Sequence, residues 1–399
     1  MKLNRNFKDL KENYLFAEVA SRVEKYKAEF PTADVISLGI GDVTLPLSTK
    51  AVEACKDAAT AMSTKAGFKG YGPYDGYASL KSAIVDYYKM RDVDINADDV
   101  FVTDGAKNGI GNFLDLFDSD NTVMIPDPVY PAYVDANVLA GNKIVYVDAT
   151  RENGFLAMPP KRGKADIIYI CSPNNPTGAA YSKAQLKQWV DFALSTGAVI
   201  LYDAAYEAYI EGKNIVRSIF EVQGARDCAV EFCSFSKMAG FTGVRCGWTV
   251  IPMGSPLNRM WLHRQAIKFN GTSYIVQRMA ESMLRGGFGD TKKMVAEYKH
   301  NAKIITKKFD ELGIEYTGGV NAPYIWFNCG IDSWQFFDYL LKNARIVCTP
   351  GSGFGKNGNG WVRLTSFNSK ERTEQAMLRF GPFWKQFIEI KDKLFAPVN

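Results

Sequence analysis

The middle of the chain alternates short hydrophobic runs, rich in β-branched residues, with segments that have a helical pattern of polar and apolar positions. Such alternation is typical of strands followed by crossover helices. The predicted segments, in order, are Asp99–Thr103, Ala106–Phe117, Thr122–Ile125, Tyr133–Ala140, Ile167–Cys171, Lys183–Leu194 and Ala198–Tyr202. We therefore predict an α/β fold with a mostly parallel sheet flanked by helices.

The alternation weakens beyond Gly287, where a long helical stretch, Met294–Leu312, leads into a mixed region and the helix-like segment Lys370–Leu394. At 399 residues the chain also exceeds the size that one hydrophobic core usually supports. We therefore predict a second, smaller α+β domain. The expected division is an N-terminal arm and part of the small domain at residues 1–45, a large domain at 46–286 and a small C-terminal domain at 287–399.

Composition excludes several classes of protein. Hydrophobic residues make up 47% and charged residues 23%, which is an ordinary globular balance. The net charge is only +5, and the basic residues are scattered among acidic ones. The sequence contains no basic stripe with interleaved aromatic residues, so we do not expect a nucleic-acid partner. The first twelve residues lack the apolar stretch of a secretory signal, and no window approaches the ~18 apolar residues of a membrane span. We therefore expect a soluble cytoplasmic protein.

Cysteine and histidine usage argues against a metal site. The seven cysteines form an odd set without CxxC spacing, so we expect free thiols in a reducing compartment. Neither of the two histidines, His263 and His300, has a second ligand at helical spacing. Most Ser-His and Cys-His hydrolases are poor candidates for the same reason, and another group must carry out any proton transfer.

Polar clusters follow the predicted strands, at the edge where parallel sheets bind ligands. In Cys233–Lys237, a lysine stands just past a strand among small hydroxyl residues. Such a lysine can form an imine with a carbonyl cofactor, and Ser234 and Ser236 could hold a phosphate. Arg245, eight residues after Lys237, could grip the same phosphate with its guanidinium. By itself this pattern also fits an exposed loop lysine.

Three further clusters fit the same cofactor. Asp203 ends an apolar strand, and a buried carboxylate there is costly unless it is paired, for instance with a protonated pyridine nitrogen. Asn175 and Tyr206 could hydrogen-bond a phenolic oxygen, and Tyr130 offers an aromatic face. Gly105-Ala106-Lys107 stands at a strand-to-helix junction, where amide groups bind anions. Each cluster alone also fits a helix cap or a plain turn.

Taken in order, these motifs resemble those of the fold-type I, class I/II aminotransferases. The shared pattern is an Asn-Pro-Thr-Gly loop at 175–178, Asp-x-x-Tyr at 203–206, Ser-x-Ser-Lys at 234–237 and the following Arg245. The resemblance implies pyridoxal 5′-phosphate (PLP) as cofactor in the large domain, carried by Lys237. It also implies catalytic roles for Lys237, Asp203 and Tyr206.

Longer stretches resemble the LL-diaminopimelate aminotransferase family, among them Gly70–Pro73, Pro128–Val134, Lys268–Gly271 and Asn321–Trp326. The resemblance implies the interconversion of LL-2,6-diaminopimelate and 2-oxoglutarate with tetrahydrodipicolinate and glutamate, in lysine biosynthesis. The implied cofactor-binding residues are Tyr71, Ala106, Lys107, Tyr130, Asn175, Asp203, Tyr206, Ser234, Ser236, Lys237, Arg245 and Asn270. The implied substrate-binding residues are Tyr14, Gly41, Lys107, Asn175, Asn270 and Arg363. Tyr71 and Asn270 would reach across the interface of a homodimer.

Two departures bear on the substrate. Tyr74-Asp75 stands where the family often has Glu-Gln, so either Asp75 or a backbone carbonyl beside Tyr74 would meet the distal ammonium. Asn359-Gly360 precedes Arg363 where Glu-Gly is common. The alternatives are another class I/II PLP enzyme, such as an aromatic or broad-specificity aminotransferase or a β-lyase, and a PLP-binding regulator. The regulator would need a DNA-binding module, for which the short segment before Tyr14 leaves little room.

Overall fold

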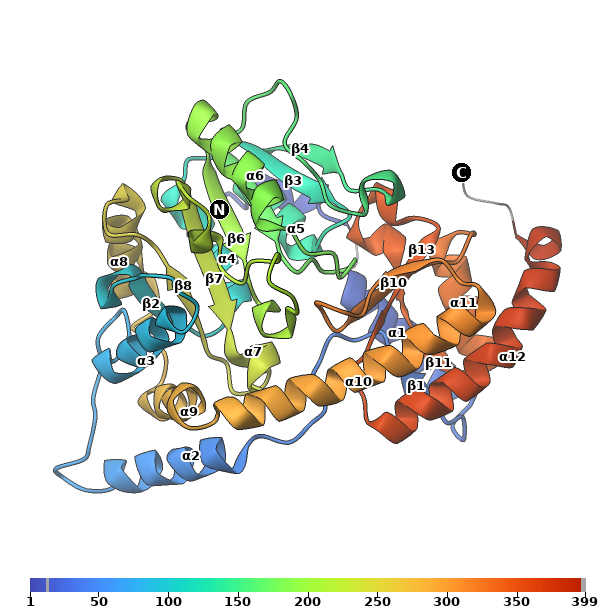
Figure 1. Cartoon of the computed structure of the whole chain (residues 1–399), viewed down its shortest axis with the longest axis horizontal. Helices are drawn as coiled ribbons and strands as arrows, with labels where there is room; N and C mark the ends of the chain where they lie inside the picture. The colour runs from blue at the N-terminus through green and yellow to red at the C-terminus, as the bar shows by residue number, and fades with distance from the viewer. Residues whose placement is uncertain (12–13, 396–399) are drawn as a thin grey trace.

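The computed structural model describes residues 1–11 and 14–395, and its centre is a seven-stranded sheet with the strand order β2-β8-β7-β6-β5-β3-β4 (Figure 1). Neighbouring strands pair in parallel except β8, which is antiparallel to both β2 and β7. The predicted α/β fold with a mostly parallel sheet is confirmed. The strands are β2 (Val100–Thr103), β3 (Thr122–Asp127), β4 (Lys143–Asp148), β5 (Ile167–Cys171), β6 (Val199–Asp203), β7 (Ala229–Ser234) and β8 (Gly247–Val250).

Helices cover both faces of this sheet, which explains why its central strands are hydrophobic at every position. In β5, Ile168 and Ile170 pack on one face and Ile167 and Tyr169 on the other, as the two-residue period of a strand requires. The first face lies against α3 (Ala78–Lys89), α6 (Lys183–Thr196) and α9 (Tyr274–Arg285). The second lies against α4 (Ala106–Phe113), α5 (Pro131–Ala140) and α8 (Pro256–Lys268).

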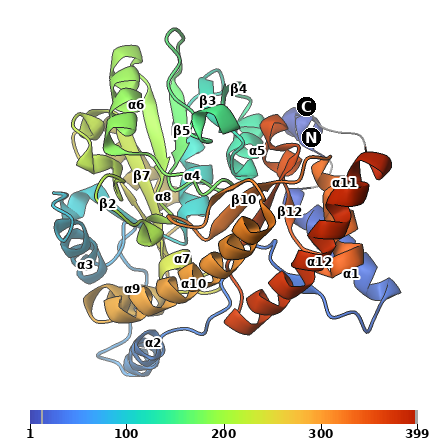
Figure 2. The same ribbon diagram turned by 45° about the vertical axis from the view of Figure 1, so that its right-hand side comes forward.

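A second sheet, of order β12-β13-β10-β9, is antiparallel throughout. Its strands are β9 (Tyr316–Gly318), β10 (Tyr324–Asn328), β12 (Thr349–Pro350) and β13 (Trp361–Thr365), and β1 (Ile36–Ser37) pairs in parallel with β11 (Ile346–Val347). The helices of this region are α1 (Leu15–Glu29), α10 (Phe288–Leu312), α11 (Ser333–Ala344) and α12 (Lys370–Leu394). Figures 1 and 2 show α10 running from beside α2 (Thr49–Met62) and α9 toward this second sheet.

The predicted helix boundaries hold with local differences. The segment Lys370–Leu394 is helical over the predicted range, whereas α10 begins at Phe288, earlier than the predicted Met294. The helix expected at 106–117 ends at Phe113 and continues as a 3₁₀ turn, Leu114–Leu116. Helix α5 begins two residues early because Pro131 occupies its first turn, where the missing N–H costs nothing.

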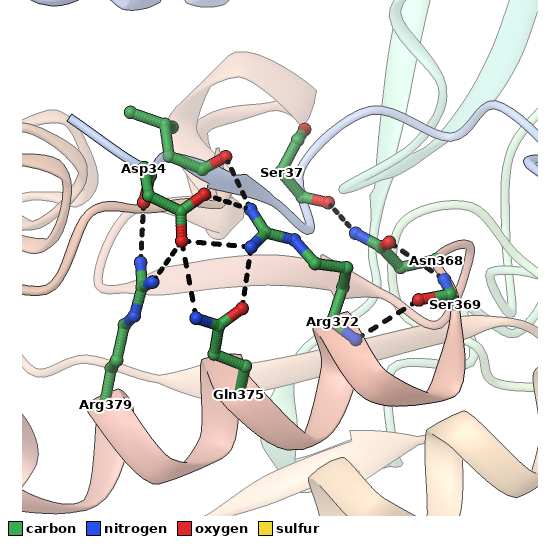
Figure 3. A network of polar contacts seen from close by, with 8 residues as sticks. Asp34, Ser37, Asn368, Ser369, Arg372, Gln375 and Arg379 are labelled. Carbon is green, nitrogen blue, oxygen red and sulfur yellow. Dashed lines mark hydrogen bonds and ion pairs between the residues drawn. The ribbon is translucent and has the colours of Figure 1, made fainter. Parts of the chain in front are cut away.

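The chain before β1 is held against α12 by Asp34 (Figure 3). Arg372 Nη2 lies 2.7 Å from Asp34 Oδ1, Arg379 forms a second ion pair with the same carboxylate, and Arg379 Nη1 donates to the Asp34 carbonyl over 2.6 Å. Nearby, Asn368 Nδ2 donates to the carbonyl of Ser37 over 2.9 Å. These contacts place β1 beside the C-terminal helix α12, although the two elements lie near opposite ends of the sequence.

The buried hydrophobic residues form separate cores, and the division into domains near residues 45 and 286 stays a prediction. One core packs Leu15, Val19 and Ile36 with residues from 302 to 387 and also takes in Phe155 and Ala179, whereas two others consist of residues between 51 and 284. The first residues behave differently, since Asn4 and Asn6 each donate a side-chain hydrogen bond to Leu139 of α5. The N-terminal arm therefore contacts both parts of the protein.

Within residues 1–11 and 14–395, no helix is both long and apolar enough to span a bilayer. In the same ranges, no group of three or more His, Cys, Asp or Glu side chains has the geometry of a metal site. All seven cysteines are free, and six of them are buried.

We expect Asp34→Asn to lower the melting temperature by about 1–2 °C at pH 7, because it removes the charge that both arginines contact and exposed ion pairs each contribute little. Arg372 and Arg379 hold the pKa of Asp34 well below its usual range. Its contribution is therefore present above the unfolded-state pKa of about 4 and fades as the pH falls below it. Thermal melts from pH 3 to 8 measure this, with Glu24→Gln on α1 as a control. A difference between variant and wild type that persists undiminished at pH 3 would contradict the assignment.

Candidate functional site

A cavity of about 310 Å³ opens at the carboxyl ends of the large sheet's parallel strands. It brings together residues from five separate stretches of the chain between Ala106 and Arg245. Of the predicted site residues, ten line it: Ala106, Lys107, Tyr130, Asn175, Asp203, Tyr206, Ser234, Ser236, Lys237 and Arg245.

One end of the cavity is built to hold an anion. Helix α4 begins at Ala106, so its first amide groups have no partner within the helix and carry a partial positive charge. Arg245 Nη1 lies 3.4 Å from Ser236 Oγ, and Ser234 Oγ accepts from the Ser236 amide over 3.1 Å. Gly105 precedes the helix with φ +124°, and a Cβ there would stand 2.5 Å from Arg245 Nη2. Glycine at 105 lets the guanidinium lie against the helix start.

Asp203 places a buried carboxyl group in the same cavity. It ends β6, its exposed fraction is 8%, and burial raises its pKa. The Tyr133 hydroxyl and the Ala205 amide both donate to it, the latter over 3.0 Å. A cation placed beside this carboxylate would offset the cost of its burial.

The Lys237 amine lies on α7 (Phe235–Met238), directly after β7. Burial lowers its pKa to about 8, and the cations Arg363 and Arg245 act in the same direction while Asp42 opposes them. The amine donates to the carbonyl of Gly41, and the Tyr209 hydroxyl donates to the Lys237 carbonyl over 3.2 Å. A pKa of about 8 leaves roughly a tenth of this amine unprotonated at pH 7, far more than for an ordinary lysine, and the unprotonated amine is the form that acts as nucleophile and base.

Arg363 is a fully buried guanidinium with no carboxylate partner among the described residues. Its Nη1 donates to Asn175 Oδ1 and its Nη2 to the Gly39 carbonyl, each over 2.6 Å. Its Nε is buried without any hydrogen-bond partner. A buried charge that keeps a free donor is poised for an anionic ligand, and a carboxylate matches the guanidinium in shape.

Two tyrosines belong to this site although the sequence did not single them out. Tyr133 donates to Asp203, and the Tyr324 hydroxyl lies 2.6 Å from the hydroxyl of Tyr206. Both occur inside the family-like stretches Pro128–Val134 and Asn321–Trp326, which was the only signal available. Their contacts join distant parts of the chain, so local spacing could not reveal them.

The remaining predicted residues lie outside the cavity lining. The Tyr14 hydroxyl is 3.3 Å from that of Tyr130, and the Gly41 carbonyl meets Lys237, so both adjoin the cavity. Tyr71 has an exposed fraction of 91% and Asn270 is also exposed. These two side chains are not brought to the cavity within the single chain.

The two departures have structural explanations. Asp75 forms an ion pair with Lys81, so its carboxylate is already engaged within the chain. Asn359 Oδ1 accepts from the amide of Ser333, at the first residue of α11, over 3.1 Å. Asn359 therefore supports a helix start rather than the cavity.

Comparison with known proteins decides the family. Residues 33–380 match the model of the family "Aminotransferase class I and II". The chain belongs to the class I and II aminotransferases. This aminotransferase is 46% identical to an LL-diaminopimelate aminotransferase of Methanosphaera stadtmanae, over 96% of this chain and 98% of that protein.

Solved structures agree with this family. The structure of the L,L-diaminopimelate aminotransferase of Chlamydomonas reinhardtii matches with a TM-score of 0.91 and 40% identity, covering 96% of this chain and 98% of that one. An aromatic aminotransferase of Pyrococcus horikoshii matches with a TM-score of 0.81 and 28% identity, over 94% of this chain and 99% of that one. The predicted PLP fold type I and the aminotransferase activity are confirmed.

Class I and II aminotransferases use PLP, and so does this aminotransferase. Its cavity fits that cofactor on three independent observations. Unpartnered amides and Arg245 meet at one end, where a phosphate needs donors. Asp203 supplies a buried carboxyl group for a cationic ring nitrogen, and Lys237 supplies an amine of lowered pKa for a carbonyl.

We expect Gly105→Ala to weaken PLP binding about tenfold or more, because the added Cβ would displace Arg245 from the start of α4. Titration of the apoprotein with PLP, followed by absorbance, measures the affinity. Gly154→Ala is the matched control, since Gly154 also has positive φ (+65°) but a Cβ there would meet nothing within 4 Å. Equal losses in both variants would mean that backbone strain, not the cradle, is responsible.

Proposed function

We propose that this aminotransferase interconverts LL-2,6-diaminopimelate plus 2-oxoglutarate with tetrahydrodipicolinate plus glutamate, a reaction of lysine biosynthesis. The observation that carries the proposal is Arg363, a buried guanidinium whose Nε lacks a partner, beside Asn175 at the edge of the cavity. Every amino acid and 2-oxo acid in this reaction has a carboxylate that could occupy it. Similarity over nearly the whole length to two proteins named for this activity supports the choice of substrate.

The residues that would hold PLP follow from the cavity. The amides of Ala106 and Lys107 would bind the phosphate, together with Ser234, Ser236 and Arg245. Asp203 would pair with the ring nitrogen, Asn175 and Tyr206 would donate to the phenolic oxygen, and Tyr130 would cover the ring. When bound, PLP supplies a carbonyl that condenses with amino groups and a ring that accepts electrons from the α-carbon.

In this arrangement Lys237 both carries the cofactor and moves protons. Its lowered pKa of about 8 keeps part of the amine neutral, so Nζ can accept the α-proton of the amino acid and pass it to the cofactor. Asp203, held by Tyr133, keeps its charge close to the ring nitrogen and so favours the protonated form of that nitrogen. Arg363 fixes the α-carboxylate, which presents the α-hydrogen in one orientation.

The distal end of diaminopimelate carries a second carboxylate and a second ammonium. We assign the carboxylate to the exposed Lys107, whose Nζ lies 5.1 Å from the ring centre of Tyr14 and is not in any ion pair among the described residues. We assign the ammonium to a backbone carbonyl beside Tyr74, because Asp75 is paired with Lys81. Tyr14 and Gly41 would complete the substrate site.

We further propose a cytoplasmic homodimer with shared sites. Two exposed side chains, Tyr71 and Asn270, support the shared sites, since both lie outside the cavity of their own chain. A twofold axis would bring each to the partner's cavity, where they would contact PLP and, for Asn270, the substrate. The seven free cysteines fit a reducing compartment.

Mixing two inactive variants tests the shared site. Lys237→Ala and Tyr71→Ala homodimers should each be nearly inactive, but hybrid dimers contain one site with both native residues. Equal amounts with random subunit exchange should recover about a quarter of wild-type activity. Exchange is verified by native mass spectrometry, and each variant incubated alone is the control. No recovery despite verified hybrids would sink the shared-site proposal.

Substrate recognition is tested with two substitutions. Arg363→Lys should lower kcat/KM about 100-fold with both diaminopimelate and glutamate, because an ammonium cannot replace the guanidinium fork. Lys107→Met should lower kcat/KM with diaminopimelate at least about tenfold more than with glutamate, because only the former has the distal carboxylate at this site.

Lys143→Met, on the exposed face of β4, controls for loss of a surface charge. Steady-state kinetics with a panel of amino acids gives the decisive comparison. If aromatic or aliphatic amino acids, or β-elimination of cysteine conjugates, exceed diaminopimelate in kcat/KM, the chain is instead an aromatic or broad-specificity aminotransferase or a β-lyase.

A further inference from the structure

The hydroxyl groups of Tyr206 and Tyr324 form a hydrogen bond of 2.6 Å between the two sheets of the protein. Tyr206 follows β6 of the large sheet, and Tyr324 opens β10 of the small one. Both side chains are buried, with exposed fractions of 8% and 1%. Water therefore cannot readily replace either partner, and the pairing depends on how the two sheets are held together.

The surroundings of Tyr324 leave its hydroxyl no other partner. Among the described residues Tyr206 is its only hydrogen-bond partner, and a Cβ on Gly41 would stand 2.7 Å from the Tyr324 hydroxyl oxygen. The guanidinium of Arg363 lies over the Tyr324 ring, 4.4 Å from its centre. A cation at this position stabilises negative charge on the phenol and makes the hydroxyl a stronger donor.

The direction of the hydrogen bond follows from counting protons. A phenol has one proton to donate, and Tyr206 can donate to the phenolic oxygen of bound PLP only if it does not donate to Tyr324. Tyr324 must then donate to Tyr206. A hydroxyl that accepts a hydrogen bond becomes a better donor itself, because the two bonds polarise each other.

We propose that Tyr324 is a positioning residue which donates to Tyr206 and so directs and strengthens the hydrogen bond of Tyr206 to the phenolic oxygen of PLP. The inference rests on the proposed placement of PLP beside Tyr206, and it adds a residue from the small sheet that does not touch the cofactor. It also joins the substrate's carboxylate site to the cofactor, since Arg363 stacks on the ring that makes this bond.

The test is the pH dependence of the absorption of the PLP-loaded enzyme. A donor to the phenolic oxygen favours its ionised form, so loss of that donor raises the pH midpoint of the spectral change. Tyr206→Phe should raise the midpoint by about 1 unit or more, and Tyr324→Phe by about 0.5–1 unit in the same direction. In the Tyr206→Phe background, Tyr324→Phe should add nothing, because Tyr324 acts through Tyr206.

The matched control is Tyr298→Phe. Tyr298 is buried in the same hydrophobic cluster as Tyr324, and its hydroxyl accepts from the amides of Thr44 and Leu45 over 2.8 Å each, away from Tyr206. Its loss should lower the melting temperature without moving the midpoint.

The outcomes separate the inference from the proposal on which it rests. If Tyr206→Phe leaves the midpoint unchanged, the placement of PLP beside Tyr206 is wrong. If Tyr206→Phe shifts it but Tyr324→Phe does not, the role of Tyr324 is overturned while the placement survives. A Tyr324→Phe shift of equal size with and without Tyr206 also overturns it, because Tyr324 would then act on the cofactor by another route.

Discussion

The burial of one unpaired positive charge organises this molecule. Arg363 has no exposed surface and no carboxylate partner among the described residues, so its charge is compensated by the Asn175 side chain, the Gly39 carbonyl and the faces of aromatic rings. These groups come from the large sheet, the N-terminal segment and the small sheet. Because a buried guanidinium is costly unless it is well surrounded, all three segments must meet at this point.

The same requirement shapes the chemistry next to it. Burial lowers the pKa of Lys237, Asp42 raises it, and the positive charges of Arg363 and Arg245 act in the same direction as burial. The amine, the anion cradle and the carboxylate site thus influence one another electrostatically within one cavity. An anionic cofactor and an anionic substrate both relieve this excess of positive charge, which explains how a single cavity can favour both ligands.

Much of this arrangement was predictable because it is local. The hydrophobic run at 167–171 forms a strand as predicted, and the run predicted at 198–202 forms one shifted by a single residue, to 199–203, since a strand buried on both faces is largely apolar. Lys237, Asp203 and Asn175 stand directly after such runs, and parallel strands end at one edge, so their convergence in one cavity followed from topology. Helix α10 begins at Phe288, directly after Gly287 at its N-cap, and not at the predicted Met294.

The sequence by itself determined which segments form the strands of the large sheet. It also determined where the chemical groups stand along the chain and to which family the chain belongs. Tertiary structure alone decided which groups touch across long separations. The contact between Tyr206 and Tyr324 joins residues 118 positions apart, and the contact between Arg363 and Asn175 joins residues 188 positions apart. Side-chain partners of this kind depend on how two independently packed sheets meet. No periodicity or spacing along one chain encodes that meeting, because it arises from shape and charge complementarity between surfaces that form only when the chain has folded.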